Sequence, residues 1–154
     1  MRKIIGYAIS SMAMANAKSP LSVVQPTSLA EKLPEVEASM GNFGHITYGQ
    51  TIIGKVVVPR GDNWHGCEPF KSADFPQLFK NDKDKHLNQA MALFIFVDRG
   101  MCSNPTKVRN IENFGGAVAL IADNHEEDMQ EFVMVDHSGN GHSLVTPGFM
   151  IDYK

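Results

Sequence analysis

The 154-residue sequence contains no cluster of lysine and arginine and no long internal hydrophobic run. Its 14 basic residues are interspersed with 17 acidic ones, which gives a formal net charge of −3. Nucleic-acid binding requires a basic surface that replaces the counterions of phosphate groups, so this class of partner is excluded. Past Ala17 no apolar stretch approaches the roughly 20 residues that cross a bilayer, so we expect no membrane contact by this segment. Any anchor would lie beyond Lys154.

The sequence also lacks the motifs of the common enzyme and metal-site classes. It has no His-Glu-x-x-His helix, no EF-hand loop and no Gly-x-Ser-x-Gly turn. A cysteine phosphatase needs a C-x5-R spacing, and after Cys102 the arginine, Arg109, comes one residue late. The residues from Asp123 to Asp128, and the pair His137 and His142, match no metal-ligand spacing. We therefore expect no catalytic thiol and no specific metal site. A Ser-His-Asp triad and an independent metal-dependent hydrolase stay open as alternatives at this point.

The residues that open the chain have the order of a secretory signal peptide. Arg2 and Lys3 provide a positive start, and a mostly apolar stretch runs from Ile4 to Ala15. Ala15-Asn16-Ala17 then carries small residues at both positions that signal peptidase reads. An ordinary N-terminal helix or strand is the alternative. We expect residues 1–17 to be a signal peptide and residues 18–154 to form one domain, because a chain that is 43% hydrophobic can bury a core.

Only two cysteines are present, Cys67 and Cys102. In a chain that enters an oxidising compartment, such a pair usually forms a disulfide, whereas two buried free thiols are the alternative. Closing a loop of this length stabilises a fold by about 3–4 kcal/mol in the chain-entropy model. The predicted disulfide and the predicted signal peptide support each other. Both indicate the lumen of the secretory pathway or the extracellular space.

The hydrophobic pattern predicts an α/β fold dominated by strands. Two apolar runs, Ala90 to Val97 and Ala117 to Ala122, predict strands buried on both faces. Between them Asn104 is the expected N-cap, Pro105 the first helical residue and Gly115-Gly116 the helix end. This order indicates a right-handed parallel crossover. Further strands are expected at 18–24, at 52–58 with a bulge at 54–55, at 132–135 and at 149–151, with short helical turns after Pro26.

A polar segment rich in Gly, Pro, Asp and Lys runs from Arg60 to Asn88. Its large apolar side chains follow neither a helical nor a strand period, so we expect a long surface excursion held to the core by these side chains and by Cys67. Connections of this length are usually functional or mobile. The side chains concerned are Trp64, Phe70, Phe75, Leu78 and Phe79.

The loop after the first buried strand, Asp98 to Cys102, is the best candidate for a binding site. Ligands of α/β folds collect at the carboxyl ends of strands and at helix N-termini, where backbone amides point outward. Arg99 can donate several hydrogen bonds to a carboxylate or to peptide carbonyls, and Gly100 permits close approach of a ligand backbone. A structural turn, with Arg99 paired to Asp98 or to solvent, is the alternative.

Several of these segments together resemble a protease-associated (PA) domain. The likeness rests on residues 98–102, on Lys107-Val108-Arg109-Asn110, on the helix end at 115–117 and on the strand at 119–123. Upstream segments narrow it to the amino-terminal PA domain of vacuolar sorting receptors. These segments are Ser19-Pro20, residues 40–44, Tyr48-Gly49, the strand at 54–57 and Cys67.

The resemblance implies a strand sandwich or open barrel flanked by two or three short helices, without enzymatic activity or cofactor. It also implies a receptor that carries soluble cargo from the Golgi to vacuolar compartments and binds the sorting peptide of that cargo. The peptide-binding role carries over to the loop residues and, less directly, to the Gly-Asn-Phe-Gly turn. The residues are Arg99, Gly100, Met101 and Cys102, followed by Asn42 and Phe43.

The sequence departs from the family in two places. Asn104 stands two residues after the loop cysteine, where the family usually has an aromatic residue, so we expect a different cargo preference. The sequence ends at Lys154, before the last PA helix, the EGF-like repeats and the membrane span of such receptors.

The alternative function is a PA domain that acts as a lid or substrate-selection insert of a protease or a membrane-bound ubiquitin ligase. His45, His65 and His125 are candidates for a pH response, since imidazole titrates between Golgi and vacuolar pH.

Overall fold

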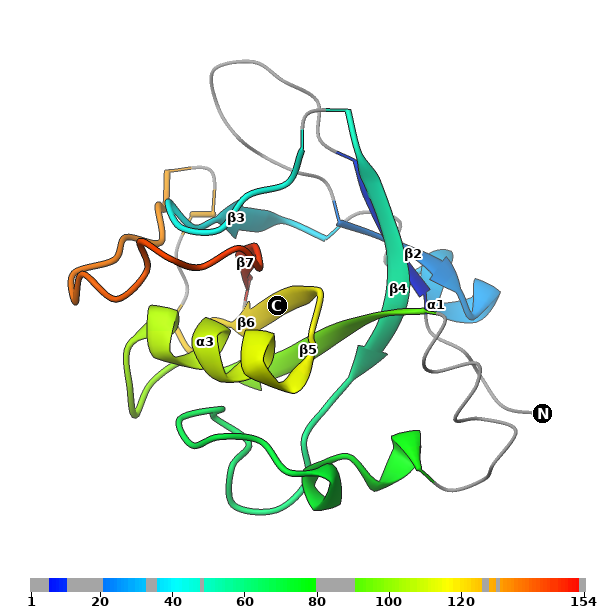
Figure 1. The fold of residues 1–154 in the computed structure, drawn as a ribbon. Coiled ribbons are helices and arrows are strands. Elements are labelled where there is room, and N and C mark those ends of the chain that lie inside the picture. The colour runs from blue at the N-terminus through cyan, green and yellow to red at the C-terminus, as the bar shows by residue number, and fades with distance from the viewer. Residues whose placement is uncertain are drawn as a thin grey trace.

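A computed structural model describes residues 6–10, for which it gives the backbone, and residues 21–32, 36–47, 49–79, 91–125, 128–129 and 131–152. Seven strands form one sheet in the order β2-β1-β4-β5-β6-β7-β3 (Figure 1). The strands are β1 Gly6–Ser10, β2 Leu21–Gln25, β3 Ala38–Met40, β4 Thr51–Val57, β5 Ala92–Asp98, β6 Val118–Ala122 and β7 Gly148–Ile151. The described residues also include the α-helices α1 Thr27–Ala30 and α3 Asn104–Phe114 and the short 3-10 helices η1 Ser72–Asp74 and η2 Pro76–Leu78. The predicted strand-dominated α/β class is confirmed.

The centre of the sheet is parallel and its flanks are antiparallel. Strands β4, β5, β6 and β7 pair in parallel, while β1 and β2 on one flank and β3 on the other run antiparallel to their neighbours. Helix α3 connects β5 to β6, so the predicted parallel crossover is confirmed. The carboxyl end of β5 therefore leads directly into the amino end of α3, which positions the candidate loop.

The sheet buries a hydrophobic cluster on each face, which explains why its central strands are apolar without alternation. On the α3 side, Ile95 and Ile121 pack against Val108 and Ile111 of the helix. On the opposite side, Phe94 belongs to a second cluster. The other members of that second cluster are Leu21, Ala38, Val118, Leu120 and Phe149. Full burial of each such side chain contributes about 1.5–3 kcal/mol, so both faces hold the sheet together.

Helix α3 begins one residue earlier than the sequence predicts. Ser103, and not Asn104, is the N-cap, because its hydroxyl accepts a hydrogen bond from the amide of Thr106 at 3.3 Å. Pro105 is consequently the second helical residue. The predicted end is confirmed, since Gly115 caps the helix with a left-handed φ of 96°.

Two other predictions of local structure are wrong. Strand β4 pairs with β1 and β5 without a register shift, so no bulge lies at Gly54-Lys55. Gly54 is instead required for space, because a Cβ there would lie 2.4 Å from the carbonyl oxygen of Ala92. Residues 132–135 form no strand. The place beside β7 is taken by β3, and the 132–135 segment makes only isolated hydrogen bonds with residues at β3 instead of a ladder. The amide of Asn42 donates to the carbonyl of Met134, and the hydroxyl of Ser39 donates to the carbonyl of Phe132.

The long excursion is described up to Phe79; residues 80–90 lie outside the described part. Phe75 and Leu78 are buried in the α3-side cluster, as expected of side chains that hold the excursion. Trp64 and Phe79 remain about half exposed, at 47% and 45%.

Residues 11–20, with the predicted cleavage position, also lie outside the described residues, so the signal peptide stays a prediction.

Candidate functional site

Three segments distant in sequence meet around the loop that joins β5 to α3. The excursion approaches from one side and the segment before β7 from the other; in Figure 1 the first lies below α3 and the second to its upper left. The main chain of the loop is hydrogen-bonded to the excursion and to the end of β6. The amide of Asp98 donates to the carbonyl of Trp64 at 3.4 Å, and that of Arg99 to the carbonyl of Ala122 at 2.9 Å.

The predicted disulfide between Cys67 and Cys102 is confirmed. The sulfur atoms are 2.11 Å apart and the two Cα atoms 5.8 Å apart. The bond connects the excursion to the last residue of the loop, 35 positions along the chain. It fits a lumenal or extracellular location, because structural disulfides persist in oxidising compartments.

Arg99 is held by a carboxylate from β6, not by its neighbour Asp98. One guanidinium nitrogen lies 2.6 Å from Oδ1 of Asp123, directly after β6, and the guanidinium carbon lies 5.4 Å from the centre of the Phe132 ring. The Asp123 side chain is fully buried, whereas the Arg99 side chain is 28% exposed. The pair therefore orients the guanidinium, and the Arg99 side chain stays partly exposed at the hollow.

The tip of the loop is a γ-turn with a left-handed residue at its centre. The amide of Cys102 donates to the carbonyl of Gly100 at 2.9 Å, across Met101. Gly100 and Met101 have φ angles of 101° and 67°. For methionine this conformation is strained, and such strain concentrates at functional sites. The Met101 side chain is also 83% exposed, which is unusual for a large apolar residue.

A hollow of about 370 Å³ lies between this loop, the start of α3 and the segment before β7. It brings together three of the four predicted loop residues with three residues from the opposite wall, which sequence reasoning missed. A second hollow of about 230 Å³ continues along α3, and Pro105 lines both. The first is lined by Arg99, Gly100, Cys102, Ser103, Asn104, Pro105, Val135, His137 and Ser138, and the second by Pro105, Thr106, Arg109, Asn140 and His142.

The opposite wall is rigid because Asp136 organises its turn. This carboxylate accepts hydrogen bonds from the amide of Ser138 at 2.8 Å, its hydroxyl at 2.7 Å and the amide of Gly141 at 2.7 Å. These bonds, that of the Ser138 hydroxyl above all, lower the pKa of Asp136 to about 2. The turn therefore keeps the charge of Asp136 and its three hydrogen bonds far below neutral pH.

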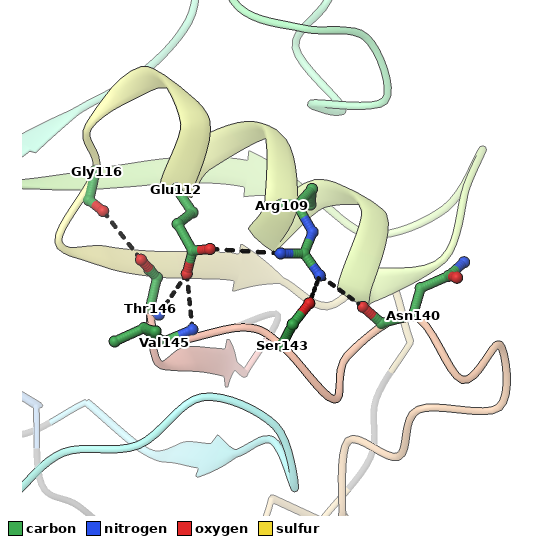
Figure 2. A network of polar contacts seen from close by, with 7 residues as sticks. All are labelled: Arg109, Glu112, Gly116, Asn140, Ser143, Val145 and Thr146. Atoms are coloured by element: carbon green, nitrogen blue, oxygen red, sulfur yellow. Dashed lines mark hydrogen bonds and ion pairs between the residues drawn. The ribbon is translucent and has the colours of Figure 1, made fainter.

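Helix α3 fastens the same wall further along, as Figure 2 shows. One carboxylate oxygen of Glu112 accepts the amides of Val145 at 2.8 Å and Thr146 at 2.7 Å. Arg109 donates to the carbonyl of Asn140 at 2.9 Å and to the hydroxyl of Ser143 at 2.7 Å. The segment before β7 is thus hydrogen-bonded to the helix at four residues, and one of them, Asn140, lines the second hollow.

The Gly-Asn-Phe-Gly turn lies behind this wall. Phe43 is 4% exposed and belongs to the core, and the Asn42 side chain accepts a hydrogen bond from the amide of Asp136 at 3.1 Å. Because its ring is buried, Phe43 could contribute to binding only through the 132–143 segment, whereas Asn42 is exposed but lines neither hollow. His45, His65 and His125, the candidates for a pH response, line neither of these two hollows, whereas His137 lines the first and His142 the second.

Within the described ranges, no three His, Cys, Asp or Glu side chains are grouped as metal ligands. Over the same residues, no helix combines the length and the apolarity that a bilayer crossing requires. The fold and the site define a class of protein, a disulfide-bonded α/β domain. The loops that follow its parallel strands enclose a shallow, partly polar hollow.

Over most of its length the chain is similar to vacuolar sorting receptors, at about 30% identity. Vacuolar-sorting receptors 3 and 4 of Arabidopsis thaliana are each 30% identical to it over an alignment of 168 residues, gaps included. The alignment covers 97% of this chain and 26% of each receptor. Vacuolar-sorting receptor 1 of Pisum sativum is 32% identical over 128 residues, which cover 81% of this chain and 18% of that receptor. The chain thus spans about a quarter or less of the length of these relatives. No protein-family model matches it.

Proposed function

We propose that this domain is a non-catalytic module of the PA type that binds the sorting peptide of soluble cargo in the lumen of the secretory pathway. The observation that carries the proposal is the hollow of about 370 Å³ beside a partly exposed, oriented arginine. Its homologues at about 30% identity are vacuolar sorting receptors, which supports the same role.

The chemistry of the hollow suits an extended peptide. Arg99 offers donors to a carboxylate or a peptide carbonyl, and Val135 and Pro105 offer apolar contacts to side chains. The amide of Asn104 at the start of α3 has no acceptor among the described residues, so it can donate a hydrogen bond to an oxygen of the peptide. Backbone recognition of this kind gives affinity, and the pockets beside it give specificity.

Arg99→Ala alone is a poor test, because it leaves the buried carboxylate of Asp123 without its counter-charge. The double variant Arg99→Ala/Asp123→Asn removes both charges together. Asp123→Asn alone controls for the second change, and Arg60→Ala controls for loss of an arginine at an exposed position outside both hollows.

The experiment has two stages. Disulfide-bonded protein first captures lumenal proteins at neutral and acidic pH, and peptides from the captured proteins are then titrated by fluorescence anisotropy. We expect the double variant to weaken peptide binding about tenfold or more, as loss of hydrogen bonds from a charged donor implies, and Arg60→Ala to change it less than about twofold. Unchanged affinity in the double variant would refute the assignment of the site.

A further inference from the structure

Lys107 is a buried lysine whose ammonium group faces the candidate loop. Its exposure is 0%, on the side of α3 that also carries Val108 and Ile111. The ammonium nitrogen lies 2.7 Å from the carbonyl oxygen of Gly100, 2.6 Å from that of His65 and 3.6 Å from the sulfur of Cys67. An ammonium group has three hydrogens, and each of these atoms can accept one.

Keeping a charge at this position is costly, so a purely structural filler would be apolar. Burial lowers the pKa of Lys107 to about 8, and the negative charge of Asp98 only partly opposes this. The other groups around the ammonium are the carbonyl of His65 and the sulfur of Cys67, which is disulfide-bonded and does not titrate. The guanidinium of Arg99, next to Gly100, is turned toward Asp123.

The contact with Gly100 fixes the orientation of one peptide group. The carbonyl of Gly100 receives hydrogen bonds from Lys107 and from the amide of Cys102, so it points into the protein. The bond between Gly100 and Met101 is trans, and in a trans peptide the C=O and the following N–H point in opposite directions. The amide of Met101 therefore points outward, and it has no acceptor among the described residues.

We propose that Lys107 is a positioning residue for ligand binding: by holding the carbonyl of Gly100 it presents the amide of Met101 to a carbonyl or carboxylate oxygen of the bound peptide. This inference rests on the proposed function. It accounts for the left-handed Met101, since a strained turn persists only where surrounding contacts enforce it.

Asn110 provides a matched comparison on the same helix. It is 8% exposed, and its side-chain amide donates to the carbonyl of Gly66 at 2.9 Å. Asn110 thus holds the excursion as Lys107 does, but it makes no described contact with Gly100 or Met101. Asn110→Ala removes a structural bond of this kind while leaving the Met101 amide in place.

The decisive measurement uses the wild-type full chain, with its disulfide intact, at pH 6.5 to 9.5. The probe is an acetylated and amidated peptide chosen from the capture experiment, so that its ends do not titrate. We expect affinity to fall about tenfold as the pH rises through about 8, because the neutral amine loses both a hydrogen and its charge.

Stability must change in the opposite direction over the same range. The pKa of Lys107 is about 8 in the folded protein and 10.5 in the unfolded chain, so the unfolded state binds more protons between these values. The free energy of unfolding therefore rises with pH while affinity falls. If Lys107 only stabilised the fold, the affinity of the folded protein would show no step near pH 8, although its stability would still rise with pH.

Lys107→Met, which keeps the length of the side chain and removes the charge, should bind the peptide about tenfold more weakly and show no step near pH 8. Asn110→Ala should keep the step.

An NMR pH titration of the wild-type amides of Gly100, Met101 and Cys102 gives a readout without peptide. A common midpoint near 8 supports the positioning role even if no peptide binds, in which case the proposed function alone fails. Unshifted amides, or wild-type affinity in Lys107→Met, would overturn the inference.

Discussion

Glu112 shows how one side chain couples the helix to the wall of the binding site. Burial disfavours its charged form, but the hydrogen bonds from Thr146 and Val145 and the nearby Arg109 together outweigh burial and lower its pKa below 4.5. A lowered folded-state pKa means that the carboxylate stabilises the fold above the unfolded-state pKa. This contribution is lost as the pH falls through the folded-state pKa.

Glu112→Gln should therefore destabilise the protein in a pH-dependent way. The glutamine oxygen can still accept the amides of Val145 and Thr146, but the ion pair with Arg109, 3.5 Å away, is lost. We expect a loss of about 0.5–1.5 kcal/mol in the free energy of unfolding at pH 7, shrinking toward zero as the pH drops below 4.5. Urea unfolding at pH 7 and pH 3 measures it. Glu68→Gln, at an exposed glutamate, is the control, and equal stability of Glu112→Gln and wild type at pH 7 would contradict the prediction.

The residue types in the sequence predicted the candidate loop, but they did not predict that the buried Lys107 contacts it. Arg99, Gly100 and the cysteine pair were recognisable because arginine, glycine and cysteine each have a restricted set of uses at the end of a strand. Lys107 carried one unused signal: it lies four residues before Ile111, on the apolar side of the predicted helix, where a lysine needs buried partners. Its partners, the carbonyls of His65 and Gly100, belong to loops whose paths no local pattern specifies.

At the level of elements, β5, α3 and β6 were predictable because their signals are local. Two apolar runs and a capped helix between them determine the crossover with little help from the rest of the chain. The 132–135 segment has an equally apolar sequence but forms no strand, and it is β3 that pairs with β7. Which segment takes an edge depends on pairing between residues about a hundred positions apart, so local pattern cannot decide it.

The two glycines after α3 should respond differently to substitution. Gly115 has a left-handed φ of 96° with open space around it, whereas a Cβ on Gly116 would lie 2.5 Å from Cγ2 of Ile111. Gly115→Ala should cost about 1–2 kcal/mol and Gly115→Asn less, because asparagine tolerates this conformation. At Gly116 the order should reverse, with Ala costing about 1–3 kcal/mol and the larger Asn more. Thermal unfolding of the four variants tests this, and the same order at both positions would count against it.

For the whole molecule, the site depends on the parallel half of the sheet. Strands β4 to β7, with β3 beside them, carry the loop, the helix and the opposite wall. Strand β1, Gly6–Ser10, lies between β2 and β4, within the residues that the sequence predicts to be a signal peptide. A mature protein cannot both lose residues 1–17 and keep β1. Since β1 pairs only with β2 and β4, its removal leaves the described pairings of β4 to β7 and β3 unchanged.

We therefore expect the full chain, secreted from a eukaryotic cell, to begin at Lys18 and to bind the captured peptides. Intact mass and N-terminal sequencing identify the first residue. Ala15→Asp/Ala17→Asp places charges where signal peptidase requires small residues, so this variant should keep residues 1–17. Removal of β1 also exposes the edge of β4, and we expect the processed protein to protect fewer amides of Thr51–Val57 from hydrogen exchange than the uncleaved variant. A secreted wild-type protein that still carries Gly6–Ser10 would show instead that β1 is a permanent strand of the sheet.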